Sequence, residues 1–299
     1  MLYSLRLPAL TYKNGRGDNR SDAIILLSEP PVALSFARPN KDWGTDEYAG
    51  PADIWNPNEG FLITQSDPAS YALNFPSTGA DGLFFDLELE GADPDQLIWE
   101  PVAHEGITAT VTRTRSSDRW FRGMVTRVTL KGPEARAQWY NPHPSRISVP
   151  RLPQTFELVG RDRGGNEIVK YGFVLQKWFV HRGGKGDYSF YQADWCNGLG
   201  YRMPQVKDLT NAVCFGLHSG RHCEGAVGAT PSSTGNHYQR RIGAGFFAEW
   251  GLMANYDGAG FNSFGDYWTG EASFGVNSMS GSVRSTYPSF VSYGICVVP

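Results

Sequence analysis

The sequence has no run of about eighteen apolar residues, the length a helix needs to cross a membrane. We therefore expect no membrane insertion by this part of the chain. It also has no basic cluster: acids and bases are interspersed and the net charge is −3, so nucleic-acid binding has little electrostatic support. Residues 1–20 lack the apolar stretch and small-residue cleavage site of a secretory signal peptide.

Common catalytic motifs are missing as well. The sequence contains no G-x-S-x-G, no H-E-x-x-H, no P-loop and no G-x-G-x-x-G after a strand, and its six histidines are scattered. Acidic pairs exist, but nothing in the sequence singles out one of them. The sequence therefore predicts no enzymatic activity, no cofactor and no metal.

Cysteine is absent from residues 1–195, and all four cysteines lie in the last third of the chain. An even, clustered set is typical of two disulfides in one module, which form in an oxidising compartment. Without a signal peptide, this pattern indicates a fragment of a longer exported chain, and a cytosolic protein is the alternative. The four residues are Cys196, Cys214, Cys223 and Cys296.

The remaining composition favours short strands over helical bundles. Apolar residues make up 40% of the 299 residues, and glycine (35) and proline (19) are abundant. A chain of this length accommodates two domains. We expect a mainly β protein with an α+β C-terminal domain.

The first predicted domain covers residues 1–180. Apolar and polar residues alternate in 83–90, 107–113 and 124–130, where Met124 shares a face with Val128 and Leu130, as in half-buried antiparallel strands. Residues 161–167, RDRGGNE, form a glycine-rich hairpin turn between apolar runs. These features predict an immunoglobulin-like β-sandwich, with loop-rich residues 1–60 that include strands at 23–29 and 32–36.

The second predicted domain covers residues 181–299, with its boundary in 181–187. Four apolar residues at every third position predict a short helix that Gly198 and Gly200 can end. Pro204 suits the first position of a second helix over 204–213. Glycine- and aromatic-rich strands follow. The four apolar residues are Phe190, Ala193, Cys196 and Leu199.

Cys196 has several possible roles. A nucleophile needs an activating base and benefits from a helix N-terminus, whereas Cys196 lies towards the C-terminal end of its predicted helix. We favour a disulfide with Cys296, whose loop of about 100 residues is worth about 4–5 kcal/mol in loop-entropy estimates. The segment CFGLHSGRHC offers Cys214, Cys223 and two histidines, His218 and His222, to a zinc ion, but its close spacing favours a local disulfide; free thiols are a third possibility.

The aromatic and acidic stretch 256–271 is the predicted binding site. Large rigid side chains on glycine-containing loops suit contact with a protein or a glycan, although Trp268 itself is expected in the core. Calcium binding is not expected, because the stretch has no dense run of acidic residues at alternating positions. Arg16-Gly17-Asp18, a tripeptide that integrins read on exposed turns, is expected to be an ordinary solvated turn. The expected contacts are Tyr256, Asp257, Phe261, Asp266 and Tyr267.

Three segments carry a family resemblance: 195–210 (WCNGLGYRMPQVKDLT), 265–271 (GDYWTGE) and 293–299 (YGICVVP). Together they resemble a C-type-lectin-like domain, and more closely the tip domain of the intimin and invasin adhesins of Gram-negative bacteria. In that family an immunoglobulin-like domain precedes the terminal lectin-like domain, the order inferred here. The resemblance is strongest over 180–299 and weakest over 1–60.

The resemblance implies a bacterial cell-surface adhesin tip in the outer membrane, facing outward, that binds a host-cell receptor without calcium. It implies missing upstream domains with a membrane barrel, a Met1 added for expression, and a terminal disulfide like Cys196–Cys296. The expected partner is a host surface protein or glycan, bound by a monomer. Alternatives are a phage or prophage tail receptor-binding protein, a carbohydrate-binding lectin module, an enzyme of the formylglycine-generating type with a reactive cysteine pair, and a structural spacer.

Overall fold

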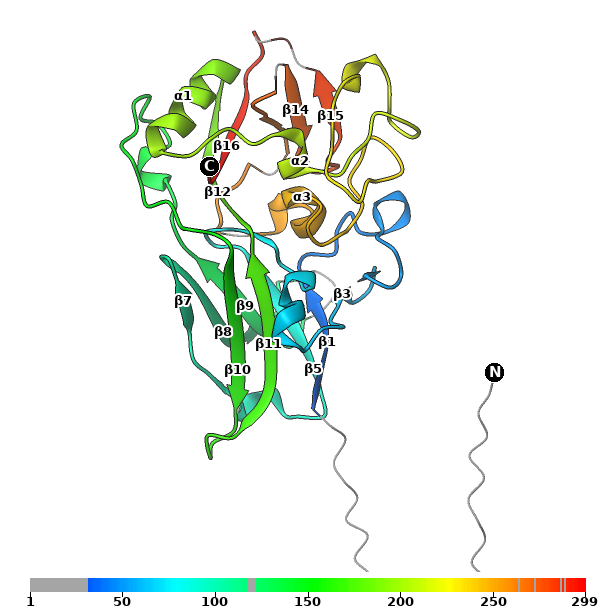
Figure 1. Cartoon of the computed structure of the whole chain (residues 1–299), viewed down its shortest axis with the longest axis vertical. Helices are drawn as coiled ribbons and strands as arrows, with labels where there is room; N and C mark the ends of the chain where they lie inside the picture. Colours follow the sequence, from blue (N-terminus) through cyan, green and yellow to red (C-terminus); the bar gives the residue numbers. More distant parts are fainter. Residues whose placement is uncertain are drawn as a thin grey trace, which may run out of the picture. The chain divides into compact units, whose positions relative to one another are not determined.

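The computed structural model describes residues 32–117, 122–256, 258–262, 264–271, 273–285, 287 and 289–299. The predicted strand at 23–29 and Arg16-Gly17-Asp18 lie outside these residues. Contacts group residues 31–299 into one compact unit. Within its described part, two β-sheets form a sandwich, and a third sheet with short helices follows (Figure 1).

The sandwich sheets are antiparallel, as the alternating sequence predicted. The larger sheet has the strand order β2 (Trp55–Asn56), β3 (Gly60–Leu62), β1 (Ala33–Arg38), β5 (Phe84–Glu90), β9 (Met124–Lys131), β8 (Ile107–Arg115) and β7 (Val102–His104). The smaller has β11 (Glu167–Leu175), β10 (Gln154–Arg161) and β6 (Ile98–Trp99). Short 3-10 helices cover Asp46–Tyr48, Pro68–Leu73, Pro94–Gln96 and Arg136–Gln138.

The predicted inward faces are confirmed for Phe85, Ile107, Val128 and Leu130, which are buried, whereas Leu89 and Val111 are only half-buried. Asp86, expected on the polar face of β5, is also buried and pairs with Arg127 (2.7 Å). Met124 was expected on the buried face of β9 but is 49% exposed, because it is the first residue of the strand and lies at the end of the sheet. The alternation of apolar and polar residues therefore predicted which face of the strand points inward, but not at which residue the buried part of the strand begins.

The glycine-rich hairpin at 161–167 is also confirmed. It joins β10 to β11, which pair in antiparallel register from Gln154 opposite Leu175 to Arg161 opposite Glu167. Gly165 has φ +84°, a left-handed conformation that favours glycine, and Asp162 accepts a hydrogen bond from the Asn166 amide (2.9 Å).

The third sheet is built mainly from the C-terminal half. Its order is β15 (Val283–Ser285), β14 (Phe274–Asn277), β13 (Asp266–Trp268), β16 (Ser292–Val297), β12 (Lys177–Asp187) and β4 (Thr78–Ala80). β4 comes from the N-terminal half and pairs in parallel with the start of β12. Residues 181–187, the predicted domain boundary, lie inside β12, whose first residues pair with β4 of the N-terminal half.

The helices differ from expectation in length and in facing. Helix α1 (Ser189–Leu199) is capped by Gly200 at φ +88°, as predicted. Helix α2 (Val206–Leu209) is much shorter than the predicted 204–213, because the chain is already extended at Thr210. Helix α3 (Phe246–Trp250) and the 3-10 helices Arg221–Cys223 and Met253–Asn255 complete the C-terminal half.

Two buried charged residues fix the junction of the halves. Glu249 is fully buried and accepts hydrogen bonds from the amides and hydroxyls of Ser77 and Thr78 and from the Gly243 amide (2.7 Å). Burial raises the pKa of this carboxyl, and hydrogen bonds from Gly243, Ser77 and Thr78 oppose that shift. Arg240, also fully buried, donates to the carbonyls of Glu249 (2.9 Å) and Asn40 (2.5 Å).

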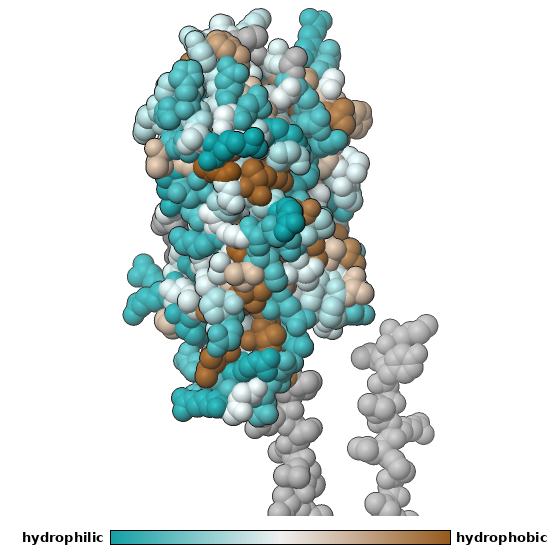
Figure 2. Space-filling view, turned by 60° about the vertical axis from the view of Figure 1, so that its left-hand side comes forward, coloured by the Kyte–Doolittle hydropathy of each residue, from teal (hydrophilic) through white to brown (hydrophobic). Residues whose placement is uncertain are grey.

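One hydrophobic cluster continues through both halves, from Ala37 in β1 to Val298. On the face seen in Figure 2, hydrophobic residues form small patches separated by polar ones. In the described part of the chain, no helix is long and apolar enough to span a membrane. The C-terminal sheet therefore shares its hydrophobic core with the sandwich.

Candidate binding site

The stretch expected to bind a partner is largely internal. The side chains of Tyr256, Phe261 and Tyr267 are only 3%, 9% and 0% exposed, and Trp268 is buried at 1%, as expected for that residue. Asp266 is half-buried in β13 and accepts a hydrogen bond from Asn277 (2.9 Å). Asp257 lies outside the described residues. The three rings belong to the core, so the expectation that they form a contact surface needs correction.

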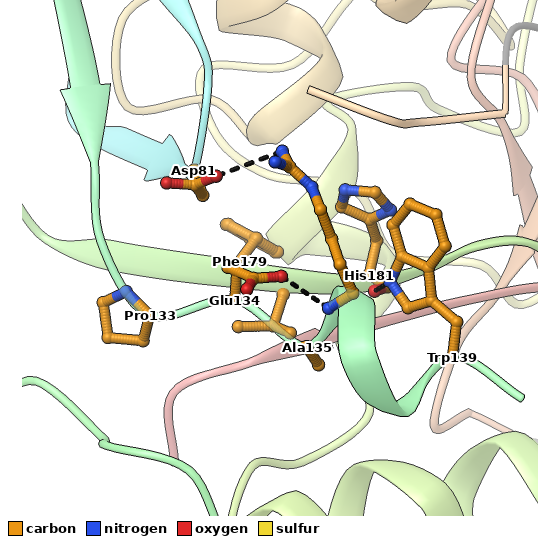
Figure 3. A pocket seen from close by; sticks show the side chains of 9 residues that line it. Asp81, Pro133, Glu134, Ala135, Trp139, Phe179 and His181 are labelled. Carbon is orange, nitrogen blue, oxygen red and sulfur yellow. Dashed lines mark hydrogen bonds and ion pairs between the residues drawn. The ribbon is translucent and has the colours of Figure 1, made fainter. Parts of the chain in front are cut away.

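Polar contacts from the rest of the molecule hold this loop in place. Arg136 donates to the carbonyls of Gly258 (2.8 Å) and Ala259 (3.1 Å) and forms an ion pair with Asp81 (3.1 Å). His181 lies 3.0 Å from the Ala259 carbonyl through Nε2. Figure 3 shows Asp81 and His181 on the walls of the small pocket between these segments. The loop is thus part of the junction of the two halves.

His181 is neutral in this setting. Its Nδ1 accepts from the Gly183 amide (3.1 Å), so the proton is on Nε2 and is donated to Ala259. Its ring stacks on Phe261 with centroids 3.9 Å apart. Burial lowers the pKa of His181 to about 3, because a charged imidazolium would lose its hydration here.

Exposed rings gather elsewhere, at the end of the third sheet where β12 ends and β16 begins. In Figure 1 helix α1 and the loop leading into β16 lie at the upper end of the molecule. Apolar and aromatic side chains there are between 38% and 75% exposed. We call this set the apical patch: Tyr188, Phe190, Tyr191, Phe264, Tyr287, Phe290 and Val291.

Strand register brings the three segments of the apical patch together. Gly186 and Asp187 of β12 pair with Tyr293 and Ser292 of β16, and Tyr293 is also the register partner of Tyr267 in β13. A Cβ on Gly186 would lie 2.8 Å from Val291, so glycine permits the close approach of that loop.

Ring contacts then extend the patch from these strand ends. The rings of Phe190 and Tyr191 are 4.1 Å apart, and Tyr188 is 6.0 Å from Phe190. Tyr287 lies 6.1 Å from Phe290. Ring contacts therefore join side chains within 188–191 and within 287–290, and strand register relates these two segments to each other and to the start of β13.

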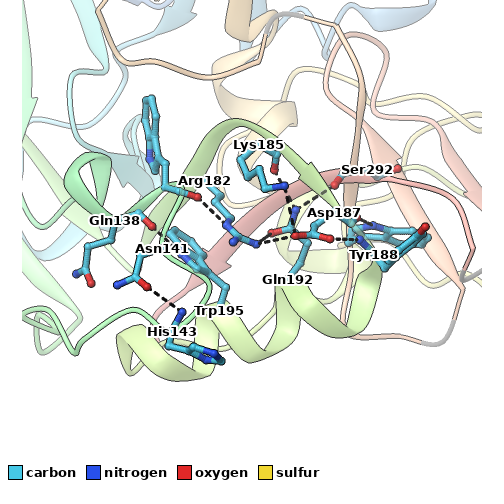
Figure 4. Close-up of polar contacts among 12 residues, drawn as sticks. Gln138, Asn141, His143, Arg182, Lys185, Asp187, Tyr188, Gln192, Trp195 and Ser292 are labelled. Atoms are coloured by element: carbon cyan, nitrogen blue, oxygen red, sulfur yellow. Dashed lines mark hydrogen bonds and ion pairs between the residues drawn. The ribbon is translucent and has the colours of Figure 1, made fainter.

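A buried polar network fixes the base of the patch (Figure 4). Gln192 of α1 donates to the carbonyls of Lys185 and Ser292, both at 3.1 Å, and so ties the helix to β12 and β16. Arg182 is 2% exposed and donates to Gln192 (3.2 Å) and Asp187 (3.5 Å). Burial lowers the pKa of this arginine, and Asp187 partly offsets the effect.

The predicted disulfides are both confirmed. Cys196–Cys296 joins α1 to β16 with both sulfurs in the core, and Cys214–Cys223 closes the loop between α2 and the later strands. The zinc alternative is wrong, because both thiols of that set are consumed in the bond. The formylglycine-generating type of enzyme needs a reactive cysteine pair that is accessible in a cleft. Cys196 and Cys296 do not meet this requirement, because both are fully buried.

The sequence reasoning placed Phe190 on the buried face of α1, and this was wrong. A helix turns by about 100° per residue, so positions spaced by three drift, and Phe190 and Leu199 differ by about 180°. The buried positions are instead Gln192, Trp195, Cys196 and Leu199. Three aromatic residues within 188–191 were a usable signal, since a short helix cannot bury all of them on one side.

The apical patch thus places large aromatic side chains beside a framework that hydrogen bonds and a disulfide hold together. Such rings contribute much of the binding energy where proteins meet, and contiguous exposed apolar patches commonly mark interaction sites. Among the described residues, no group of three or more histidine, cysteine or acidic side chains is arranged to hold a metal ion. The arrangement is suited to contact with a macromolecule.

No protein-family model and no curated protein matches the sequence. Solved structures do match. Invasin, described as a bacterial integrin-binding protein, aligns with 90% of this chain at 14% identity and a TM-score of 0.50. An intimin mutant from EHEC O157:H7 aligns with 90% of this chain and 98% of its own at 12% identity and a TM-score of 0.39. The C-terminal 282-residue intimin fragment, in complex with the intimin-binding domain of Tir, aligns with 89% of this chain and 66% of its own. The identity is 9% and the TM-score is 0.43.

The likeness to invasin shows the fold: an immunoglobulin-like sandwich followed by a C-type-lectin-like domain, as the sequence resemblance predicted. The chain spans 40% of the length of the invasin chain that it matches.

Proposed function

We propose that this chain is the receptor-binding end of a bacterial cell-surface adhesin. It binds a host surface protein as a monomer, without enzymatic activity and without calcium. It is displayed on the outer membrane as the C-terminal part of a longer exported chain. The observation that carries this proposal is the apical patch, seven exposed apolar and aromatic residues at one end of a disulfide-braced lectin-like sheet.

The fold supports the same assignment, since invasin is an integrin-binding protein with this architecture. The patch lies on α1 and on the loops before β13 and β16, and the sandwich half lies below these elements in Figure 1. This arrangement leaves the rings accessible to a large partner.

Binding then follows from burial of the rings against the receptor. The Gln192 and Arg182 contacts hold α1 to β12 and β16, so the backbone beside Tyr188, Phe190 and Tyr191 is already placed before binding. Truncation of a central aromatic anchor costs about 2 kcal/mol or more, which is about a 30-fold loss of affinity. Phe264 (65% exposed) is the first candidate for such an anchor.

Display of the chain on beads, followed by flow cytometry with human epithelial cells, tests the proposal. We expect saturable binding that persists in EDTA and is lost after the cells are treated with protease. Loss in EDTA would contradict calcium independence, and survival after protease treatment would point to a glycan or lipid receptor. Absence of binding to every human cell type tested would contradict an adhesin role.

A further inference from the structure

A second candidate site lies away from the apical patch, in a cleft of about 600 Å³. The loop 39–45, the end of the sandwich sheet at Phe84 and Arg127, and Asn255 of the C-terminal half line it. Its volume is within the range of about 300–1,000 Å³ typical of small-ligand sites. We propose that this cleft binds a neutral saccharide.

The arginines of the cleft are already paired with acids, and its lysine, Lys41, donates to the Asn58 carbonyl (2.8 Å). Arg127 forms a bidentate ion pair with Asp86, at 2.7 Å and 3.0 Å, and Arg38 forms ion pairs with Glu59 and Glu88. Both guanidinium groups are therefore neutralised by carboxylates of the protein. A phosphate or carboxylate ligand would have to compete with these acids, whereas an uncharged ligand would not.

The remaining lining groups suit hydroxyls. Asn255 donates to Asp42 (2.7 Å), which places an amide and a carboxylate side by side. Each has hydrogen-bonding capacity beyond that one bond. A sugar hydroxyl both donates and accepts, so adjacent hydroxyls match such a pair, and the exposed amide of Asn58 adds a further donor and acceptor. The prolines Pro39 and Pro57 supply apolar walls for the C–H faces of the sugar, and the ring of Phe84, with the Arg127 guanidinium 3.9 Å from its centroid, completes the lining.

The cleft is also preformed. Asn40 donates to the carbonyls of Trp250 (2.6 Å) and Leu252 (3.1 Å), and so anchors the loop 39–45 to the C-terminal half. Arg240 donates to the Asn40 carbonyl (2.5 Å) and to the Asp42 carbonyl (3.3 Å). A ligand would find these groups already placed, which lowers the cost of binding.

An array of immobilised neutral and sialylated oligosaccharides, probed with the full chain, tests this inference. The neutral oligosaccharide that gives the strongest signal is then titrated in solution by calorimetry. We expect Asn255→Ala and Asn58→Ala each to weaken its binding at least tenfold. Asn197→Ala, which changes an exposed asparagine on α1 outside the cleft, should leave it unchanged.

Three results would overturn the proposal: retention of no neutral saccharide, retention of sialylated saccharides alone, or equal affinity in the cleft variants and the wild-type chain. Asn58 is exposed, so its replacement should not disturb folding, and unfolding curves check this. The saccharide titration is separate from the cell-binding assay, so loss of Phe264 should leave it unaffected.

Discussion

Protonation of His181 should destabilise the protein as the pH falls below neutrality. In the folded protein the pKa of His181 is lowered to about 3, against about 6.5 in an unfolded chain. The unfolded state therefore binds the proton more readily, and the stability contributed by neutral His181 is present above pH 6.5 and lost as the pH falls towards 3. At pH 5 the loss is about 2 kcal/mol, from 1.36 kcal/mol per unit over 1.5 units.

Urea unfolding at pH 7 and pH 5 measures this loss, and His181→Gln provides the comparison. The glutamine can still donate to Ala259 but does not titrate. Between pH 7 and pH 5 we therefore expect the free energy of unfolding of this variant to fall by about 2 kcal/mol less than that of the wild-type chain. His143→Gln, which changes an exposed histidine, should behave as wild type. Equal pH dependence in wild type and His181→Gln, or a His181 ring that titrates near pH 6.5 by NMR, would refute the reasoning.

Three further changes test the junction and the disulfides. Glu249→Ala leaves buried donors without an acceptor and should lower the free energy of unfolding by about 3–5 kcal/mol in urea, whereas exposed Glu224→Ala should change it by less than about 0.5 kcal/mol. Alanine in place of both cysteines of Cys196–Cys296 should cost about 4–5 kcal/mol by the loop-entropy relation, about 2 kcal/mol more than the same change at Cys214–Cys223, which closes a shorter loop. The isolated segment 177–299, which begins at the first residue of β12, should unfold at lower urea than the full chain, because it lacks β4 and the donors to Glu249. Equal midpoints would show independent domains.

The sequence predicted the fold well where local pattern and burial agree. Alternation located the sandwich strands, and the glycine-rich hairpin and Gly200 marked a turn and a helix end. The even set of cysteines indicated both disulfides. These features depend on neighbouring residues or on simple pairing rules, so they can be read without a structure.

The site was harder to predict, because exposure depends on contacts between distant segments. Tyr256 and Phe261 lie on a glycine-containing loop that resembles a binding loop, but Arg136 and His181, more than 70 residues away in sequence, hold it against the core. Phe264 lies in the same loop and is exposed. Nothing local distinguishes Phe264 from Phe261. The parallel pairing of β4 with β12 could not be predicted from local sequence either, because it joins residues about 100 positions apart.

The affinity of Phe264→Ala for human epithelial cells, measured against Leu73→Ala, tests the adhesin assignment most directly. The two side chains are 65% and 63% exposed, but Leu73 lies on the 3-10 helix Pro68–Leu73 of the sandwich, outside the apical patch. We predict that Phe264→Ala weakens binding about 30-fold and that Leu73→Ala binds as wild type. Equal affinities for the two variants would contradict receptor binding through the apical patch.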